Sequence, residues 1–120
     1  MTQNPITYQL KITLSKPVRL MVGRLGSYNF PAGEYIYTGS ARRNIEARIA
    51  RHLGKNKKKL KWHIDYLLAT EEASITEIVR HSQAECKINQ NTPGIVLIPR
   101  FGASDCHSGC GSHLKYQNAP

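Results

Sequence analysis

Residues 35–53, YIYTGSARRNIEARIARHL, pass from a strand-like pattern to a helix-like pattern within one short stretch of the chain. From 34 to 38 the residues alternate, and the alternation puts Tyr35 and Tyr37 on one face of a predicted strand. An aromatic face of this kind needs an element to cover it. The residues that follow provide one.

The covering element is a predicted helix over 45–53. Asn44 is a favourable N-cap, and Gly54 favours an end to the helix directly before it. Arg48 and His52 are four residues apart and lie along the border of the apolar stripe, neither in the core nor fully solvated. At about 100° per residue, the stripe itself consists of Ile45, Ile49 and Leu53.

Two more alternating segments precede this stretch, at 8–14 (YQLKITL) and at 18–22. Glycines and the 29–33 segment mark turns between the segments. The three short strands therefore predict an antiparallel meander that is covered on one side.

The rest of the chain predicts further elements in alternation. Apolar residues keep helical spacing up to residue 68, a strand follows over 74–79, and a third helix begins near Ser82. A last short strand is predicted over 95–98. The expected fold class is α/β (α+β): a small antiparallel-rich sheet flanked by helices. We expect a single domain over 1–120 with a Cys/His-containing loop at about 100–115.

Length and charge restrict the class of function. The 120 residues correspond to about one domain. Lys and Arg number 17 against 8 Asp and Glu, and the net charge of +9 favours a polyanionic partner. The longest apolar run, 95–98, is too short to span a membrane, and the N-terminus lacks the pattern of a secretion signal. We therefore expect a cytoplasmic protein.

Basic residues concentrate after the first predicted helix, where lysine dominates 55–61. We interpret this run and its neighbours as a surface that contacts the phosphate backbone of DNA without reading its sequence. A solvated loop is the alternative interpretation. The predicted contact residues are Arg42, Arg43, Arg51, Lys55, Lys57, Lys58, Lys59, Lys61 and His63.

Cysteine and histidine gather in a Gly-rich stretch towards the C-terminus. Cys106-x3-Cys110-x2-His113, with Cys86 or His107 as a fourth ligand, has the donor atoms for tetrahedral zinc. The spacing is not that of a common zinc finger. A structural or exposed thiol cluster and a disulfide are therefore alternative interpretations.

The stretch quoted first resembles the second motif of the GIY-YIG nuclease family. In that motif a strand ending Tyr-x-Gly leads into a helix that carries an Arg and, four residues on, a His. Here these residues are Tyr37, Gly39, Arg48 and His52. The family's first motif is a strand ending Gly-x-Tyr, and Tyr8 matches its tyrosine.

One subgroup of that family, long carried as a domain of unknown function, has an extra hairpin between the two motifs. This chain looks like that subgroup throughout, over about residues 6–115. The similar blocks, in the same order, are VGRLGSYNFPAGEYIYTGSA, KWHIDYLL, AECK, FGASDC and SHL. The resemblance implies the family's fold, the extra hairpin and a nuclease activity.

Phosphodiester hydrolysis needs a base for water, a cation for the developing charge and a metal ion at the leaving oxygen. By the resemblance, Tyr8 is the base, with Tyr37 second in order. Arg48 would stabilise the charge, and His52 would relay the proton or hold a phosphate. Glu85, by its position on the third helix, would bind Mg²⁺ or Mn²⁺. We expect these five side chains to line one cleft. The metal role of Glu85 requires it to lie on the same face of the sheet as Tyr8 and Arg48, and a place on the opposite face would remove that role.

Each of these residues also has a structural explanation. The tyrosines could be strand aromatics packed under a helix, and Arg48 and His52 could be solvated. Glu85 could complete a capping box with Ser82 at the start of the third helix.

The sequence thus predicts a divalent-metal-dependent DNA endonuclease, with RNA not excluded as the substrate. A noncatalytic nucleic-acid-binding module of the same fold is the first alternative, because Ile6 stands where the family's first motif has glycine. A zinc-stabilised interaction domain is the second. Since the chain has no room for a specificity domain, we expect selectivity to come from the structure of the substrate, a homodimer or a repair-protein partner.

Overall fold

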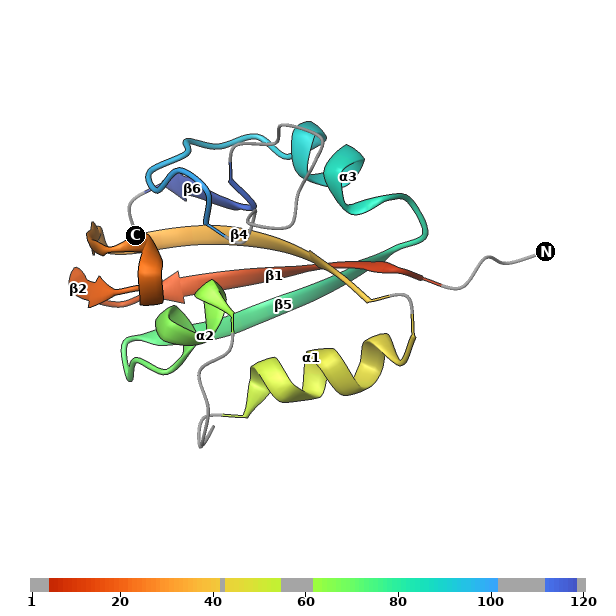
Figure 1. Ribbon diagram of the computed structural model, residues 1–120, viewed down its shortest axis with the longest axis horizontal. Coiled ribbons are helices and arrows are strands. Elements are labelled where there is room, and N and C mark those ends of the chain that lie inside the picture. The colour runs from red at the N-terminus through yellow and green to blue at the C-terminus, as the bar shows by residue number, and fades with distance from the viewer. Residues whose placement is uncertain (1–4, 42, 55–61, 102–111, 119–120) are drawn as a thin grey trace.

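The computed structural model describes residues 5–41, 43–54, 62–101 and 112–118. In Figure 1 the strands β4, β1 and β5 run side by side through the middle of the molecule, with α1 and α2 on one side and α3 on the other. The elements, in chain order, are β1 (Thr7–Leu14), β2 (Val18–Met21), a 3-10 helix (Gly23–Leu25), β3 (Ser27–Phe30), β4 (Gly33–Ser40), α1 (Ile45–Leu53), α2 (His63–Leu68), β5 (Ala73–His81), α3 (Glu85–Asn91) and β6 (Leu114–Asn118).

The main sheet has four strands in the order β5-β1-β4-β6, and every neighbouring pair is antiparallel. In the pairing of β1 with β4, Tyr8 lies opposite Gly39 and Leu10 lies opposite Tyr37. This sheet and its three α-helices form a single α+β domain in the described part of the chain. The predicted fold class is confirmed.

The predicted three-strand meander is wrong. β1 pairs with β4 along all eight residues and with β5 on its other side, whereas β2 pairs with β3 in a separate two-stranded sheet. The second strand of this hairpin is β3, whose residues 29 and 30 the sequence analysis assigned to a turn. A local turn across 22–26 therefore closes the hairpin, and β1 is left to pair with the longer strand. A hairpin therefore lies between β1 and β4 in the chain.

The strand predicted over 95–98 is also wrong. Only Ile95 forms a bridge, with Tyr116, and the side chains of Ile95, Val96 and Leu97 are exposed. The fourth strand of the sheet is β6, where the sequence analysis predicted no strand. The predicted helix up to residue 68 corresponds to α2, and the strand predicted over 74–79 lies within β5.

The two faces of the sheet are covered by different helices. Tyr8 points towards α1, where its hydroxyl contacts His52, and Gln9 points towards Thr92 at the end of α3. Successive strand residues point to opposite faces, so α1 and α3 lie on opposite faces of the sheet. The face under α1 and α2 carries the buried apolar side chains of β1, which are Tyr8, Leu10, Ile12 and Leu14.

The bounds predicted for α1 are confirmed, and the side chain of Asn44 accepts a hydrogen bond from Ala47 N at 3.3 Å as an N-cap. The predicted apolar stripe needs a correction. Leu53 is 51% exposed, whereas His52 is 2% exposed and joins Ile45 and Ile49 on the inner face. The inner face thus follows the i, i+4, i+7 spacing of a helix stripe, and its last position is a histidine.

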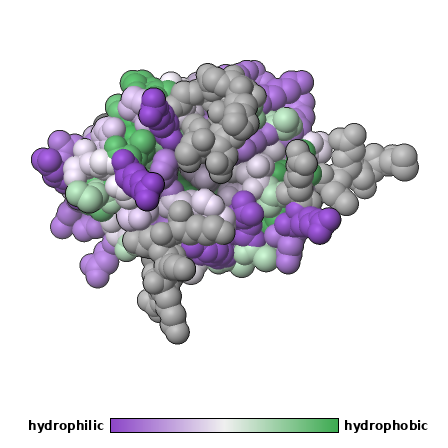
Figure 2. All heavy atoms as spheres, in the orientation of Figure 1, coloured by the Kyte–Doolittle hydropathy of each residue, from purple (hydrophilic) through white to green (hydrophobic). Residues whose placement is uncertain are grey.

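Among the described residues no helix is long and apolar enough to cross a membrane. In the space-filling view, hydrophilic side chains are spread around the rim of the molecule (Figure 2).

Candidate active site

A hydrogen bond joins the start of β1 to the last turn of α1. The Tyr8 hydroxyl lies 2.7 Å from Nε2 of His52, and both side chains are buried. The tyrosine ring packs directly on Gly39 of β4, because a Cβ on Gly39 would lie 2.6 Å from Cζ and Oη of Tyr8. The glycine of the Tyr-x-Gly pattern therefore gives the tyrosine room to reach the helix.

Arg48 lies one helical turn before His52 and also acts on Tyr8. Its guanidinium donates a hydrogen bond to the Ser40 carbonyl at 2.9 Å. Its positive charge favours the ionised form of the Tyr8 phenol and so lowers the pKa of Tyr8. With the His52 tautomer that carries its proton on Nδ1, the Tyr8 hydroxyl donates to Nε2.

Burial outweighs the effect of Arg48 on Tyr8. Loss of solvation raises the pKa of the Tyr8 phenol well above its ordinary value, although the Arg48 charge opposes the shift. The pKa of Tyr37 is also raised, mainly by burial and then by the nearby Tyr8. Both phenols are therefore neutral near pH 7, and His52 is the group placed to accept a proton from Tyr8.

Tyr37 packs beside this pair rather than at its end. Its ring lies edge-on to His52 and to Phe101, at centroid distances of 6.1 Å and 6.4 Å, and its centroid is 6.5 Å from that of Tyr8. The structure thus brings Tyr8, Tyr37, Arg48 and His52 together under α1. The hydrogen-bonded phenol in this group is that of Tyr8.

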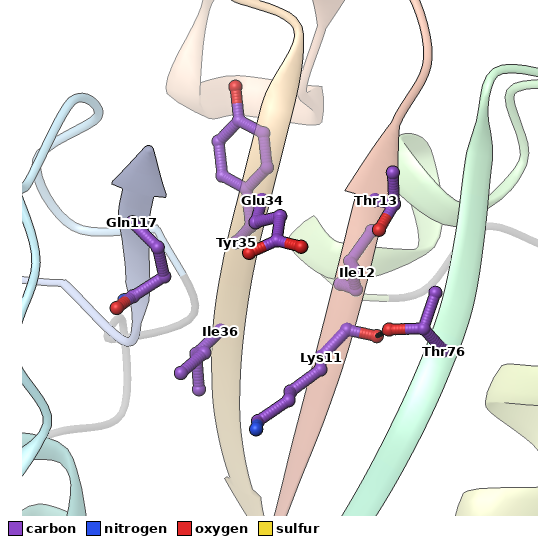
Figure 3. A pocket seen from close by; sticks show the side chains of 8 residues that line it. All are labelled: Lys11, Ile12, Thr13, Glu34, Tyr35, Ile36, Thr76 and Gln117. Carbon is purple, nitrogen blue, oxygen red and sulfur yellow. Dashed lines mark hydrogen bonds between the residues drawn. The ribbon is translucent and has the colours of Figure 1, made fainter. Parts of the chain in front are cut away.

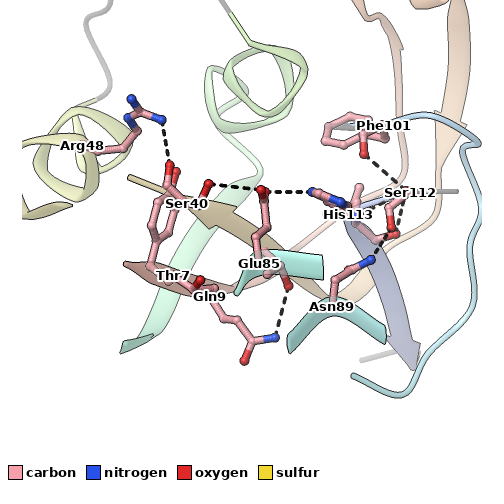
Figure 4. Close-up of polar contacts among 12 residues, drawn as sticks. Thr7, Gln9, Ser40, Arg48, Glu85, Asn89, Phe101, Ser112 and His113 are labelled. Carbon is pink, nitrogen blue, oxygen red and sulfur yellow. Dashed lines mark hydrogen bonds and ion pairs between the residues drawn. The ribbon is translucent and has the colours of Figure 1, made fainter. Parts of the chain in front are cut away.

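Glu85 begins α3 and bonds through both carboxylate oxygens. Oε1 accepts from the Ser40 hydroxyl at 3.1 Å, and Oε2 lies 2.9 Å from Nδ1 of His113 (Figure 4). The predicted capping box with Ser82 is wrong, because α3 begins at Glu85 itself and its N-cap, Ala84, makes no side-chain capping bond. Helix capping therefore does not account for this carboxylate.

The expected placement of Glu85 on the face of Tyr8 also needs a correction. Its helix covers the opposite face, and by the condition set from the sequence this counts against a metal role for Glu85 beside Tyr8. The carboxylate reaches the other residues only at the end of β4. Ser40 is the meeting point: its carbonyl accepts from Arg48, and its hydroxyl donates to Glu85 (Figure 4). Glu85 is close enough for its charge to raise the pKa of both Tyr8 and Tyr37. The five residues therefore form one network around the end of β4, with members on both faces of the sheet. They do not line one cleft.

Of the two carboxylates that act on Tyr8, only Glu85 is accessible enough to hold a hard divalent cation. Mg²⁺ is commonly bound by one or two carboxylates while it keeps several waters. The Glu85 side chain is 26% exposed, so water can reach it. Asp65, the other carboxylate that acts on Tyr8, is 0% exposed and bonded to Arg51. No group of three or more metal-ligating side chains occurs in the described ranges.

A cluster around Trp62 was missed by the sequence analysis, which quoted WHIDYL without a role. Arg51 donates two hydrogen bonds to the Asp65 carboxylate, at 2.8 Å and 2.9 Å. Asp65 also accepts from Trp62 N at 2.9 Å. The guanidinium carbons of Arg48 and Arg51 lie 4.7 Å and 4.4 Å from the Trp62 ring centroid, within cation–π range. The block thus holds the two arginines of α1 on one aromatic ring.

The remaining predicted contact residues differ in how far the structure describes them. Arg43 is exposed, and Arg51 makes the ion pair with Asp65. His63 is partly buried against Phe101, and burial lowers the pKa of its imidazole. The other predicted contact residues, Arg42, Lys55, Lys57, Lys58, Lys59 and Lys61, lie outside the described residues.

The predicted zinc ligands cannot be assembled from the described residues. Cys86 on α3 is partly buried and forms no disulfide. His113 is buried, with Nδ1 at the Glu85 carboxylate. Cys106, Cys110 and His107 lie outside the described residues, so the zinc site stays a prediction.

A groove in the sheet lies away from this network. It is lined mostly by side chains of the face opposite Tyr8, among them Lys11, Glu34, Thr76 and Gln117 (Figure 3). Lys11 is already paired with Glu77 at 2.7 Å. The groove contains none of the five candidate residues.

The fold and the network define a compact α+β domain in which a buried tyrosine–histidine pair, an arginine and a carboxylate meet at the end of one strand. A family model described as a domain of unknown function, DUF123, matches residues 7–120, and the chain belongs to this family. No curated protein and no solved structure gives a significant match.

Proposed function

We propose that the protein is a divalent-metal-dependent endonuclease that hydrolyses phosphodiester bonds in DNA. The observation that carries the proposal is the arrangement of Tyr8 between a proton acceptor and a fixed cation. Its hydroxyl bonds to Nε2 of His52, and the charge of Arg48 lowers the pKa of the phenol. The resemblance to the GIY-YIG nucleases, which places catalytic roles on the same residues, supports this assignment.

Tyr8 would activate the attacking water through His52. Because burial raises the pKa of Tyr8, a phenolate is not the resting form. In the proposed step, the Tyr8 oxygen accepts a proton from water while the phenol proton passes to Nε2 of His52. Tyr8 is again a neutral phenol afterwards, and the imidazole of His52 carries the proton.

Arg48 would stabilise the negative charge that develops on the phosphoryl oxygens. One of its nitrogens is held by the Ser40 carbonyl at 2.9 Å, and its ring contact with Trp62 fixes the guanidinium plane. A donor that is fixed before the reaction stabilises the transition state without paying for reorganisation.

Glu85 would hold Mg²⁺ or Mn²⁺, which when bound supplies positive charge at the leaving oxygen. The carboxylate is bonded to Ser40 and His113 and is partly exposed, so it is both oriented and accessible to water. The net charge of +9 and the predicted lysine surface would hold the DNA backbone near the network.

A noncatalytic nucleic-acid-binding module is the second candidate function. The burial of Tyr8, whose residue is 1% exposed, favours it, because a base must be reached by the water that it activates. Such a module would bind nucleic acid through the basic surface without cleaving it.

The test is incubation of the wild type and of Arg48→Ala with supercoiled plasmid, flap and branched DNA, and matching RNA, in Mg²⁺ or Mn²⁺. The proposal expects the wild type to cut DNA. Arg48→Ala should lose about 2.7–4 kcal/mol of transition-state stabilisation, by analogy with removal of one preorganised donor. Cleavage of RNA but not of DNA would make RNA the substrate in place of DNA. Binding without cleavage of any substrate would favour the second candidate.

A further inference from the structure

One oxygen of the Glu85 carboxylate is hydrogen-bonded to a buried histidine, His113. The proposed reaction assigns no role to this histidine. Nδ1 of His113 lies 2.9 Å from Oε2 of Glu85. The side chain of His113 is 2% exposed and that of Glu85 is 26% exposed. The histidine therefore faces the protein interior, and the carboxylate faces water on its other side.

The backbone fixes His113 in place from two directions. Its N–H donates to the Phe101 carbonyl at 2.8 Å, and its carbonyl accepts from Thr38 N at 3.0 Å. The imidazole thus projects from a chain segment that is bonded to β4. A side chain with so little freedom can impose its orientation on a partner.

A second contact ties α3 to the same segment. Asn89 donates from Nδ2 to the Ser112 carbonyl at 2.8 Å (Figure 4). Glu85 and Asn89 are four residues apart and share one face of the helix. The start of α3 is therefore held against residues 112–113 over a full turn, and the Glu85 carboxylate cannot rotate without losing its bond to His113.

We infer that His113 is a positioning residue for the Glu85 carboxylate, which it orients to bind a divalent cation. The inference rests on the proposed function, because it assigns Glu85 the cation. A donor behind a ligating carboxylate fixes which oxygen lone pairs remain open, and loss of such a partner typically weakens metal affinity by roughly 10–100-fold. Ser40 makes the companion bond to the other oxygen.

The test measures Mn²⁺ binding to the full chain without DNA, by electron paramagnetic resonance of free Mn²⁺. The variants are His113→Leu, His113→Asn and His113→Gln. The amide nitrogen of asparagine can take the place of Nδ1, whereas that of glutamine reaches the position of Nε2. Far-UV circular dichroism and thermal unfolding identify the folded variants.

We expect His113→Leu and His113→Gln to weaken Mn²⁺ binding about 10–100-fold and His113→Asn to restore most of it. In cleavage assays the same variants should raise the KM for Mn²⁺ more than they lower kcat. His81→Leu is the matched control. His81 is a partly buried histidine at the end of β5 with a side-chain partner, Gln9 at 3.0 Å, and this partner lies outside the network.

The variant Glu85→Gln distinguishes failure of the metal role of Glu85 from failure of the positioning role of His113. If this variant binds Mn²⁺ as the wild type does, or if the wild type binds none, Glu85 is not the metal ligand. The metal role in the proposed function and this inference are then both overturned. If Glu85→Gln loses Mn²⁺ but folded His113→Leu keeps wild-type affinity, only the role of His113 is overturned. Should His113→Leu fail to fold, equal affinities of His113→Asn and His113→Gln would overturn it in the same way.

Discussion

The Tyr8 hydroxyl lies 2.7 Å from Nε2 of His52, across 44 residues of sequence. The bond joins the start of the first strand to the last turn of the first helix, and Gly39 lies beneath the tyrosine ring. It links the fold to the proposed chemistry, because the contact that buries Tyr8 also gives its proton an acceptor.

Removal of the two phenols one at a time should identify the catalytic tyrosine. We expect Tyr8→Phe to lower the cleavage rate by about 10²–10⁴-fold, since it removes the group that passes a proton to His52. Tyr37→Phe should keep most of the activity, because the Tyr37 ring packs beside the pair. Single-turnover rates at saturating protein measure both. Loss of activity in Tyr37→Phe alone would make Tyr37 the base.

Gly39→Ala should displace Tyr8 from its position. The backbone at Gly39 suits alanine, since its φ is not among the positive values, but the new Cβ would lie 2.6 Å from the Tyr8 ring. We expect a loss of about 1–3 kcal/mol of unfolding free energy in urea, together with loss of cleavage.

The matched control is Gly54→Ala, where the nearest atom to a Cβ is the Arg51 carbonyl oxygen at 3.5 Å. We expect this change to stay within about 0.5 kcal/mol of the wild type. Equal effects of the two substitutions would show that the contact between Gly39 and Tyr8 does not constrain the site.

Within the ion pair of Arg51 and Asp65, loss of the arginine should lower the free energy of unfolding more than loss of the aspartate charge. Arg51→Met leaves a fully buried carboxylate without its main cation, which should cost roughly 3–5 kcal/mol. Asp65→Asn leaves an arginine that is 30% exposed and can turn to water, so its cost should be about 1.5–3 kcal/mol. Urea unfolding measures both. A larger loss for Asp65→Asn would contradict this account of the cluster.

Binding to DNA should weaken steeply with salt. A surface that neutralises about 4–6 phosphates gives a slope of roughly −4 to −5 in a plot of log K against log salt concentration. Substitution of Lys57, Lys58 and Lys59 together by alanine should weaken binding about equally on every sequence. Fluorescence anisotropy on labelled duplexes measures both effects, and a flat response to salt would exclude backbone contact as the source of affinity.

The sequence predicted the parts of the fold that depend on local signals. The bounds of α1 follow from Asn44, Gly54 and the spacing of Ile45 and Ile49, and all of these are short-range features. The position of His52 on the inner face could not be read in the same way. Leucine is the more apolar residue at the end of that helix, and the burial of the histidine depends on long-range contacts such as its bond to Tyr8.

The pairing of strands that are distant in the sequence could not be predicted from local patterns. Alternation marks 18–22 and β4 as strands equally well, and nothing local states which of them pairs with β1. The same holds for the partners of Glu85. A Ser-x-x-Glu pattern predicts a capping box, whereas the structure joins Glu85 to Ser40 and His113, which are 45 and 28 residues away.

The most direct test of the proposed function is a comparison of the wild type with Glu85→Gln in Mg²⁺-dependent cleavage of DNA. Glutamine keeps the size of the side chain and removes the charge that would hold the cation. Single-turnover cleavage and DNA affinity are measured on the same preparations. We expect the wild type to cut, Glu85→Gln to lose cleavage, and both to bind DNA with nearly equal affinity. Undiminished cleavage by Glu85→Gln, or a wild type that cuts no plasmid, flap or branched DNA in Mg²⁺ or Mn²⁺, would contradict the account.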